Sequence, residues 1–407
     1  MPTLRVYLHG SMLRTARAGT FPAMAVLQAA VESRGWRVAF EPAGPAAQQT
    51  PPPPGDFALL HMKRPLHPRT LTLRPAYHYP FWRIEPVAER WRFAVARAVY
   101  DPGEVDGEVA AAFLRRLRAR VLPGPPPTRD GPILVPLQGH LRRHRSFQSM
   151  SPVEMLAAVC ATGEPVTATL HPRERYEAED HAALAALAAR YPRLTIGGDT
   201  PALLRTCRFV ATQNSAVAFD GLILGKPAVL FAQIDFHHVG LNVAELGAEA
   251  ALAAAAAAAP DFAPYLWWFL KRHSIDAQAP DAGERMLAAM RAGGWLLCPR
   301  CPCAAPPCAA GSGAAARSRK GRGHGGTGGH RRGRSGRAAG GGLAQGRGVR
   351  RADHAHRRRA GPALPAPAAQ QGLHEGRRRQ PPRPQARELL CPCLLYTSDA
   401  ADERSSV

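Results

Sequence analysis

The sequence predicts an α/β fold in which two Rossmann-like units face each other across a cleft, followed by a C-terminal tail of different composition. Three observations predict it. Residues 132–250 alternate short apolar segments with amphipathic ones, residues 1–122 do so less regularly, and a proline-rich linker at 123–131 separates them. Residues 251–295 are expected as closing helices that tie the two units together, and residues 296–407 as the tail.

The first unit has strand and helix signals of ordinary length. Strands are expected at 4–10, 36–43 and 56–62, and helices at 21–35 and 109–122. The run of prolines at 51–54 predicts a loop, because proline has no backbone donor. The aromatic segment at 77–101 is expected to pack in a core rather than to stack nucleic-acid bases.

The second unit is more regular and predicts a parallel sheet. Five strands are expected at 132–138, 165–172, 193–198, 208–214 and 227–233, with helices between them at 151–161, 178–192, 199–208 and 215–226. Strict alternation of strands and helices requires right-handed crossovers. In such sheets ligands bind beyond the carboxyl ends of the strands. Two closing helices are expected at 265–275 and 282–295.

Polar residues follow three of these strands. His171 ends one strand, Gln213, Asn214 and Ser215 end another, and Asp235, His237 and His238 follow the last. Ser215 suits a helix N-cap that would leave the N–H groups of Ala216 and Val217 available to an anion. With His171 as a further donor, this predicts a phosphate site that needs no metal.

Simpler interpretations stand beside that one. The His-Pro pair recurs at His67-Pro68 without an obvious strand, so the dipeptide alone carries little information. Ser215 can be an ordinary cap, and the two histidines at 237–238 can be a polar loop. Lys226 is no phosphate-loop lysine, because no GxxxxGK motif precedes it, and the Gly-Lys-Pro triplet indicates a helix end before a strand.

The segments TLHPRE and RLTIGGDTPALLRTCRFVATQNSAVAFDGLILGKPAVLFAQIDFHH carry a family resemblance. They resemble the capsule polysaccharide biosynthesis family that includes the bacterial β-Kdo transferases, over about residues 131–245. The resemblance implies a GT-B-like fold, with acceptor binding in the first unit and the nucleotide sugar in the second. It also implies that His171, Asn214 and Ser215 surround the phosphate of CMP-Kdo, with Gln213 shaping the loop and Asp235, His237 and His238 in a possible donor-site loop.

The predicted function is a metal-independent glycosyltransferase of capsule or surface polysaccharide biosynthesis. It would use a CMP-linked ulosonic acid as substrate, with no cofactor, and a glycan or glycolipid as acceptor. The body of the chain has no Asp-x-Asp pair, which argues against a manganese-dependent transferase. A base must accept the acceptor's proton, and the candidates are Asp56, His61, Glu85 and Asp101; spacing does not choose among them.

Two alternatives belong to other classes. One is a non-catalytic polysaccharide assembly or export partner that retains nucleotide binding. The other is a nucleic-acid binder, suggested by a formal net charge of +22. Most of that charge lies in the tail, which has 21 Lys and Arg against 6 Asp and Glu, so the body gives no support for nucleic acid as a partner.

The tail is expected to form no packed structure, because it lacks periodic apolar residues. Its composition resembles GC-rich DNA translated out of frame, and its last residues resemble an adapter-derived peptide. Cys298 and Cys301 have zinc-ligand spacing without a second pair, and the body's Cys160 and Cys207 suggest no disulfide scaffold. The first residues look like a strand rather than a signal peptide, which predicts a cytoplasmic protein with possible peripheral contact at the inner membrane.

Overall fold

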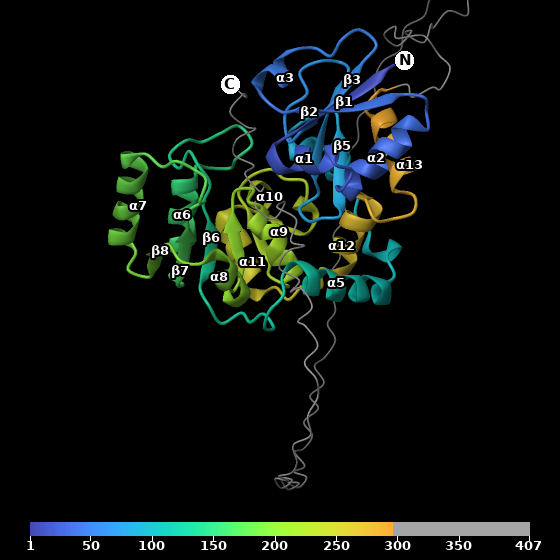
Figure 1. Ribbon diagram of the computed structural model, residues 1–407. Helices are drawn as coiled ribbons and strands as arrows, with labels where there is room; N and C mark the ends of the chain where they lie inside the picture. Colours follow the sequence, from blue (N-terminus) through green and yellow to red (C-terminus); the bar gives the residue numbers. More distant parts are fainter. Residues whose placement is uncertain (296–407) are drawn as a thin grey trace, which may run out of the picture. The chain divides into compact units, whose positions relative to one another are not determined.

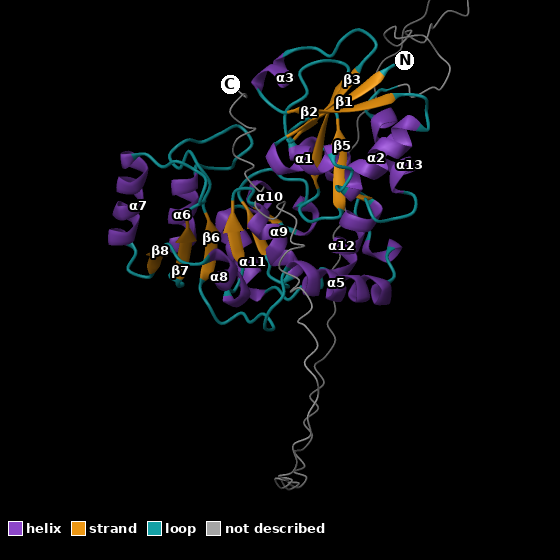
Figure 2. Cartoon of the chain, viewed as in Figure 1, coloured by secondary structure: helices purple, strands orange, loops and turns teal. Residues whose placement is uncertain are grey.

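The computed structural model describes residues 1–295, which form two α/β units built on separate six-stranded sheets. Figure 1 shows the strands and helices in sequence colours, and Figure 2 shows them by type. The predicted fold class is therefore confirmed. The tail at 296–407, including Cys298 and Cys301, lies outside the described residues.

The first sheet is mixed. Its order is β12-β5-β4-β3-β1-β2, in which β2, β1, β3 and β4 run parallel, while β5 runs antiparallel to both β4 and β12. Its elements are β1 Thr3–Leu8, α1 Gly10–Arg17, α2 Pro22–Glu32, β2 Arg37–Pro42, α3 Pro45–Gln49, β3 Phe57–His61, β4 Thr70–Pro75, β5 Phe81–Glu85, η1 Arg90–Arg92, α4 Ala94–Arg97, η2 Pro102–Glu104 and α5 Gly107–Val121. Apolar residues of α2 such as Leu27 and Val31 are buried against this sheet.

The second sheet is fully parallel, as the strand-helix alternation predicts. Its order is β11-β10-β9-β6-β7-β8, and all five expected strands are present. Its elements are β6 Ile133–Pro136, α6 Pro152–Cys160, β7 Val166–Thr169, α7 Ala178–Arg190, β8 Leu194–Ile196, α8 Thr200–Thr206, β9 Val210–Thr212, α9 Ala216–Ile223, β10 Ala228–Leu230, η3 His237–Val239, β11 Leu241–Asn242, α10 Val243–Leu246 and α11 Ala248–Ala257.

The last described residues return to the first sheet. Helix α12 Ala263–Trp267 continues as one π-helical turn, η4 Trp268–Arg272, and packs against α5 and α9. Strand β12 Ile275–Asp276 then joins β5, and α13 Ala282–Ala292 packs on α2. A buried aromatic cluster around Tyr265, Trp268 and Phe269 holds these segments, because large apolar side chains give the most stabilisation when buried.

Lys226 has a structural role in this fold. Its side chain is 1% exposed, and its Nζ donates to the carbonyl oxygens of Thr128, Arg205 and Cys207. Burial lowers the pKa of this amine. The lysine thus ties the 123–131 segment to the second unit, consistent with the expectation that it is no phosphate-loop residue.

Cys160 and Cys207 are buried free thiols, and burial raises the pKa of each to about 11.

Candidate functional site

The second sheet has a topological switch point at its carboxyl edge. Strand β6 lies between β7 and β9, so the chain leaves β6 toward one side of the sheet and later returns to its other side. This is the 3-2-1-4-5-6 order of dinucleotide-binding sheets, in which ligands occupy the crevice between the two diverging connections. The loops that follow β6, β7 and β9 therefore define the candidate site.

The Gln213–Ser215 triplet lies at this edge and is closely packed. Gln213, Asn214 and Ser215 are 1%, 1% and 7% exposed. The Gln213 Nε2 donates to the Met150 carbonyl at 3.0 Å, which places the loop after β6 beside β9. The triplet is therefore held by neighbouring segments as well as by its own strand.

Ser215 is the N-cap of α9, as expected. Its Oγ accepts a hydrogen bond from the Val217 N–H at 3.3 Å. The expectation that the Val217 N–H stays available to an anion is wrong, because the cap itself uses that donor.

His171 follows β7 and is half-buried. Its Nδ1 accepts from the Arg173 N–H at 3.2 Å, and its own backbone N–H donates to the Tyr176 hydroxyl at 2.8 Å. With Nδ1 as an acceptor, the neutral imidazole carries its proton on Nε2. His171 and Ser215 share an edge of the sheet, but their strands, β7 and β9, are not neighbours. Strand β6 lies between them, so they are two strand spacings of about 5 Å each apart.

The loop after β10 places its three polar residues differently. Asp235 is 1% exposed and accepts a hydrogen bond from the Tyr77 hydroxyl. His238 contacts the Tyr265 hydroxyl through Nδ1 at 3.1 Å and the Ala98 carbonyl through Nε2 at 2.9 Å, and burial lowers its pKa. Of the three, His237 alone lines the pocket described below.

Two residues of the first unit complete the surroundings of the triplet, and the sequence did not single them out. Arg90 donates to the Asn214 carbonyl at 2.8 Å and to the Tyr77 hydroxyl at 2.9 Å. Tyr77 stacks on Phe219 of α9 with ring centroids 4.1 Å apart. Both lie in the aromatic segment at 77–101 that was expected to pack in a core. The aromatic composition of that segment was the only sequence signal that pointed to these two residues.

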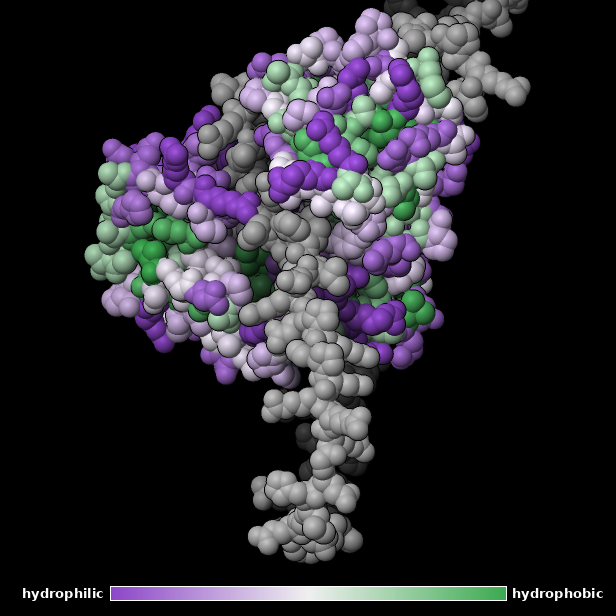
Figure 3. Space-filling view, viewed as in Figure 1, coloured by the Kyte–Doolittle hydropathy of each residue, from purple (hydrophilic) through white to green (hydrophobic). Residues whose placement is uncertain are grey.

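The loop after β6 is basic, with three arginines and no acidic residue at 137–151, whereas the loop after β7 carries Glu174 and Glu177 beside its two arginines. Figure 3 shows hydrophilic side chains gathered where these loops lie. Their exposed arginines are Arg142, Arg143, Arg173 and Arg175. Arg142 pairs with Glu177 and Asp180 at 3.2 Å each. The arginines of the loop after β6 give the edge that carries His171 an excess of positive charge, which favours anionic ligands there.

A pocket of about 700 Å³ lies next to the triplet. It is lined by Trp91 and Ala96 of the first unit, by the end of the loop after β6, and by residues between 230 and 245. The Ser149 N–H donates to the Phe231 carbonyl at 2.7 Å, and the Gln233 N–H donates to the Phe147 carbonyl at 2.9 Å. These bonds fix the loop after β6 against the end of β10.

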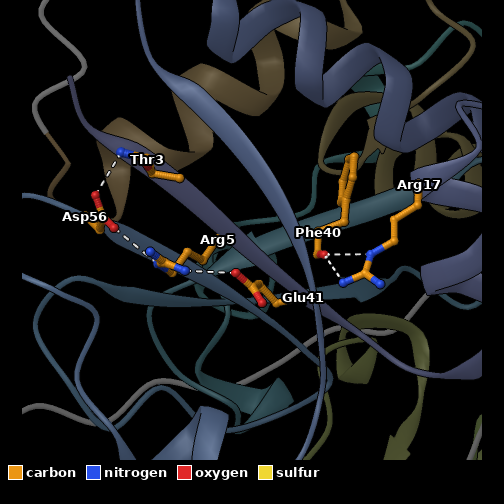
Figure 4. Close-up of polar contacts among 6 residues, drawn as sticks. All are labelled: Thr3, Arg5, Arg17, Phe40, Glu41 and Asp56. Carbon is orange, nitrogen blue, oxygen red and sulfur yellow. Dashed lines mark hydrogen bonds and ion pairs between the residues drawn. The ribbon is translucent and has the colours of Figure 1, made fainter.

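The candidate acceptor-side bases all have structural contacts. Asp56 accepts from the Thr3 N–H at 3.0 Å and from Arg5 Nε at 3.1 Å, and Arg5 also pairs with Glu41 (Figure 4). Glu85 accepts from the Ala94 N–H, and burial raises its pKa.

The other two candidate bases, Asp101 and His61, are also either held by a backbone hydrogen bond or enclosed. Asp101 is exposed and accepts from the Gly103 N–H at 2.8 Å. His61 is 1% exposed, and its pKa falls to about 3, first through burial and then through His9, Arg74 and Lys63.

Within residues 1–295, no cluster of three or more His, Cys, Asp or Glu side chains could hold a metal ion. In the same residues, no helix has both the length and the apolar character that a membrane crossing requires.

No protein-family model matches the chain, and no curated protein matches its sequence. Among solved structures, the chain is similar to KpsC of Thermosulfurimonas dismutans, a β-Kdo 2,7 transferase, with 14% identity and a TM-score of 0.35 over 61% of this chain and 90% of that one. It is also similar to a D-lactate dehydrogenase from Sporolactobacillus sp., with 12% identity and a TM-score of 0.16 over 61% of this chain and 76% of that one. Both similarities are distant, and the function proposed below rests on the residues of this chain.

Proposed function

We propose that this protein is a metal-independent glycosyltransferase of capsule or surface polysaccharide biosynthesis. Its donor would be a CMP-linked ulosonic acid such as CMP-Kdo, and its acceptor a glycan or glycolipid, in the cytoplasm or at the cytoplasmic face of the inner membrane. One observation carries the proposal: the His171-Pro172 and Gln213-Asn214-Ser215 motifs lie at the carboxyl edge of a parallel sheet, on either side of its switch point.

The proposed reaction moves one sugar to an acceptor hydroxyl. The hydroxyl oxygen attacks the anomeric carbon of the donor, the bond from that carbon to the phosphate oxygen breaks, and CMP leaves with the bonding electrons. The hydroxyl proton passes to a base. Negative charge develops on the departing phosphate, so fixed donors that face it lower the barrier.

His171 is the donor we assign to that phosphate. The hydrogen bond from the Arg173 N–H fixes Nδ1 as an acceptor, which leaves Nε2–H to face a ligand. The positive end of α9, capped by Ser215, adds a second favourable field. Because β6 separates these two groups, we propose that the nucleotide spans both rather than placing one oxygen between them.

The basic loops support the choice of an anionic donor. A CMP-ulosonic acid carries a phosphodiester and a carboxylate, and exposed arginines beside His171 would attract both. We expect this attraction to weaken as salt is added, because exposed charges are screened within about 8–10 Å at physiological ionic strength.

Nucleotide-dependent thermal stabilisation tests the proposal. We expect CMP to raise the melting temperature of the full chain, since a ligand at 100 times its Kd adds roughly 2.7 kcal/mol. His171→Ala should weaken CMP binding, while His67→Ala, a half-buried His-Pro histidine between β3 and β4, serves as the matched control. Unchanged CMP binding in a destabilised His171→Ala protein would contradict the phosphate site.

A second candidate is a non-catalytic polysaccharide assembly or export partner that binds the nucleotide. It is favoured by the contacts of the four candidate bases, because two are buried and the other two accept backbone hydrogen bonds. CMP binding without turnover of any CMP-sugar tested would favour this candidate. Transfer from CMP-Kdo to an acceptor would exclude it.

A further inference from the structure

The pocket of about 700 Å³ is not explained by the proposed phosphate site. Neither His171 nor the Gln213–Ser215 triplet lines it. It is large enough for one or two sugar rings, since small-molecule sites commonly occupy about 300–1,000 Å³. The loop after β6 lines the pocket, and its Met150 carbonyl accepts a hydrogen bond from Gln213. The pocket and the triplet therefore contact the same loop.

One wall of the pocket is aromatic. Trp91 is half-buried and stacks on Phe147, with centroids 4.9 Å apart and ring planes 20° apart. The indole is therefore held in one orientation, while part of it remains accessible. The C–H face of a pyranose ring packs well on such a surface, because it buries apolar area at little cost in side-chain entropy.

The pocket is also lined by neutral groups that both donate and accept. Gln148, Gln233 and Asn242 line the pocket with carboxamides, and Glu245 adds a carboxylate. Carboxamides match sugar hydroxyls, which also both donate and accept. Gln148 is 6% exposed, and its Oε1 accepts from the Arg145 N–H, whereas its Nε2 has no hydrogen-bond partner among the described residues.

The charge of the pocket differs from that of the basic loops. No Lys or Arg is among its lining residues in the part of the chain that the structure describes, and Glu245 is negative. Arg145 lies close by, with its guanidinium 4.7 Å from the Phe147 ring centroid, but it does not line the pocket. Apart from the imidazole of His237, whose Nδ1 contacts the Ile234 carbonyl, the lining offers a phosphate or a carboxylated sugar no group that could carry a compensating positive charge, so it favours an uncharged ligand.

We propose that this pocket binds an uncharged pyranose unit of the acceptor glycan, with Trp91 under the ring and Gln148, Asn242 and Glu245 on its hydroxyls. The inference rests on the proposed function, of which it names the acceptor class. It separates the two substrates by charge: the anionic donor lies at the basic loops and the neutral acceptor sugar lies in the aromatic pocket.

Binding of simple glycosides to the full chain tests this inference without any donor. The probes are methyl β-D-glucopyranoside, methyl β-D-galactopyranoside and methyl N-acetyl-β-D-glucosaminide, with the methyl glycoside of N-acetylneuraminic acid as the charged comparison and CMP measured separately. Saturation-transfer NMR gives the affinities. Trp91→Ala and Glu245→Ala change the pocket, and Trp267→Ala and Glu249→Ala are the matched controls, because neither control residue lines it.

We expect at least one uncharged glycoside to bind and the carboxylated one to bind less well. Trp91→Ala should weaken the uncharged glycoside roughly tenfold, which corresponds to about 1.4 kcal/mol. Glu245 is exposed, so Glu245→Ala tests the pocket even if loss of the Trp91 stack destabilises the fold. The two controls should leave glycoside binding unchanged, and all four variants should retain CMP binding.

Three results would overturn the inference: no binding of any uncharged glycoside, binding that neither pocket variant weakens, or loss of CMP affinity in Trp91→Ala, which would make this a nucleobase pocket. The proposed function fails separately. If the wild-type chain binds glycosides but not CMP, the sugar pocket stands and the transferase proposal does not.

Discussion

The carboxyl edges of the two sheets differ in how they use their polar residues. At the carboxyl edge of the first sheet, His61 is enclosed next to Trp82, while at the opposite, amino edge Asp56 ties the start of β1 to the start of β3. At the carboxyl edge of the second sheet, His171 stays half-buried in the loop after β7, and a pocket opens beside the triplet.

The difference does not follow from the strand order alone, because both sheets reverse their winding: the second at β6, and the first at β1, which lies between β2 and β3. It follows from what covers the strand ends. In the first sheet, β5 turns back antiparallel to β4, and the chain between them contributes Tyr77, which contacts Asp235 and Phe219 of the second unit. Polar residues near a strand end therefore indicate a site only where neighbouring segments leave that end open to a ligand.

The largest expected effect is on catalysis at the carboxyl edge of the second sheet, and it tests this comparison directly. If the protein is the proposed transferase, His171→Ala should lower turnover about 10²–10³-fold, because one preorganised donor to the leaving phosphate is lost. Steady-state transfer from CMP-Kdo measures this, with His67→Ala as the control. A small loss of turnover together with a lower melting temperature would show that His171 has a structural role, as the polar residues of the first sheet do.

The next largest effect concerns Lys226, a charged residue with a structural role at the amino end of the second sheet. Lys226→Met should lower the free energy of unfolding by about 3 kcal/mol, because three backbone carbonyls lose their charged donor. Chemical denaturation measures the change. Lys271→Met is the control: Lys271 pairs with Asp276 but is 36% exposed, so its loss should cost less than about 1 kcal/mol.

His61 tests whether the first edge is closed. Burial lowers its pKa to about 3, below the 6.5 of an unfolded chain, so between these values the unfolded state binds a proton that the folded state does not. The free energy of unfolding should therefore fall as the pH is lowered from 6.5 toward 3, by about 2 kcal/mol between pH 7 and pH 5. Urea unfolding at both pH values measures it.

The His61→Gln variant isolates this contribution. Without a titrating ring at position 61, the fall between pH 7 and pH 5 should be smaller than in the wild type. An identical pH dependence in both proteins would show that His61 binds a proton equally well in the folded and unfolded states, and hence that the first edge is open to solvent.

Ser215→Ala should have a modest effect at the second edge. Loss of the bond from the Val217 N–H should cost about 1 kcal/mol of stability, as for other N-caps. The variant frees the Val217 N–H, so CMP binding should change little, which calorimetry can measure. A large loss of CMP affinity would show that the Ser215 hydroxyl itself contacts the ligand.

The smallest effect is expected for Asp56. Asp56→Asn removes the ion pair with Arg5, which is 29% exposed, and should cost about 0.5 kcal/mol or less because surface ion pairs contribute little. If the protein is the proposed transferase, turnover should stay close to the wild-type value. A pronounced loss of turnover without a change in melting temperature would identify Asp56 as the missing base.

The sequence by itself determined the elements whose residues are neighbours along the chain. The period of the apolar residues placed the five strands of the second unit, and the serine before an apolar helix placed the cap at Ser215. Strands β4, β5, β11 and β12 were missed, although the Thr-Leu-Thr-Leu alternation of β4 was a local strand signal; β5 is buried at all five residues, and β11 and β12 have two residues each. Segments as short as β11 and β12 carry no local signal.

Only the tertiary structure decided which polar residues meet. The sequence placed His171 and Ser215 at one edge, but the strand order put β6 between them. It gave no sign that Arg90 would reach the Asn214 carbonyl 124 positions away, or that Trp91 and Phe147 would form a pocket wall. Periodicity reflects the burial of one face of a single element, whereas these contacts depend on how separate elements pack, which no local pattern records.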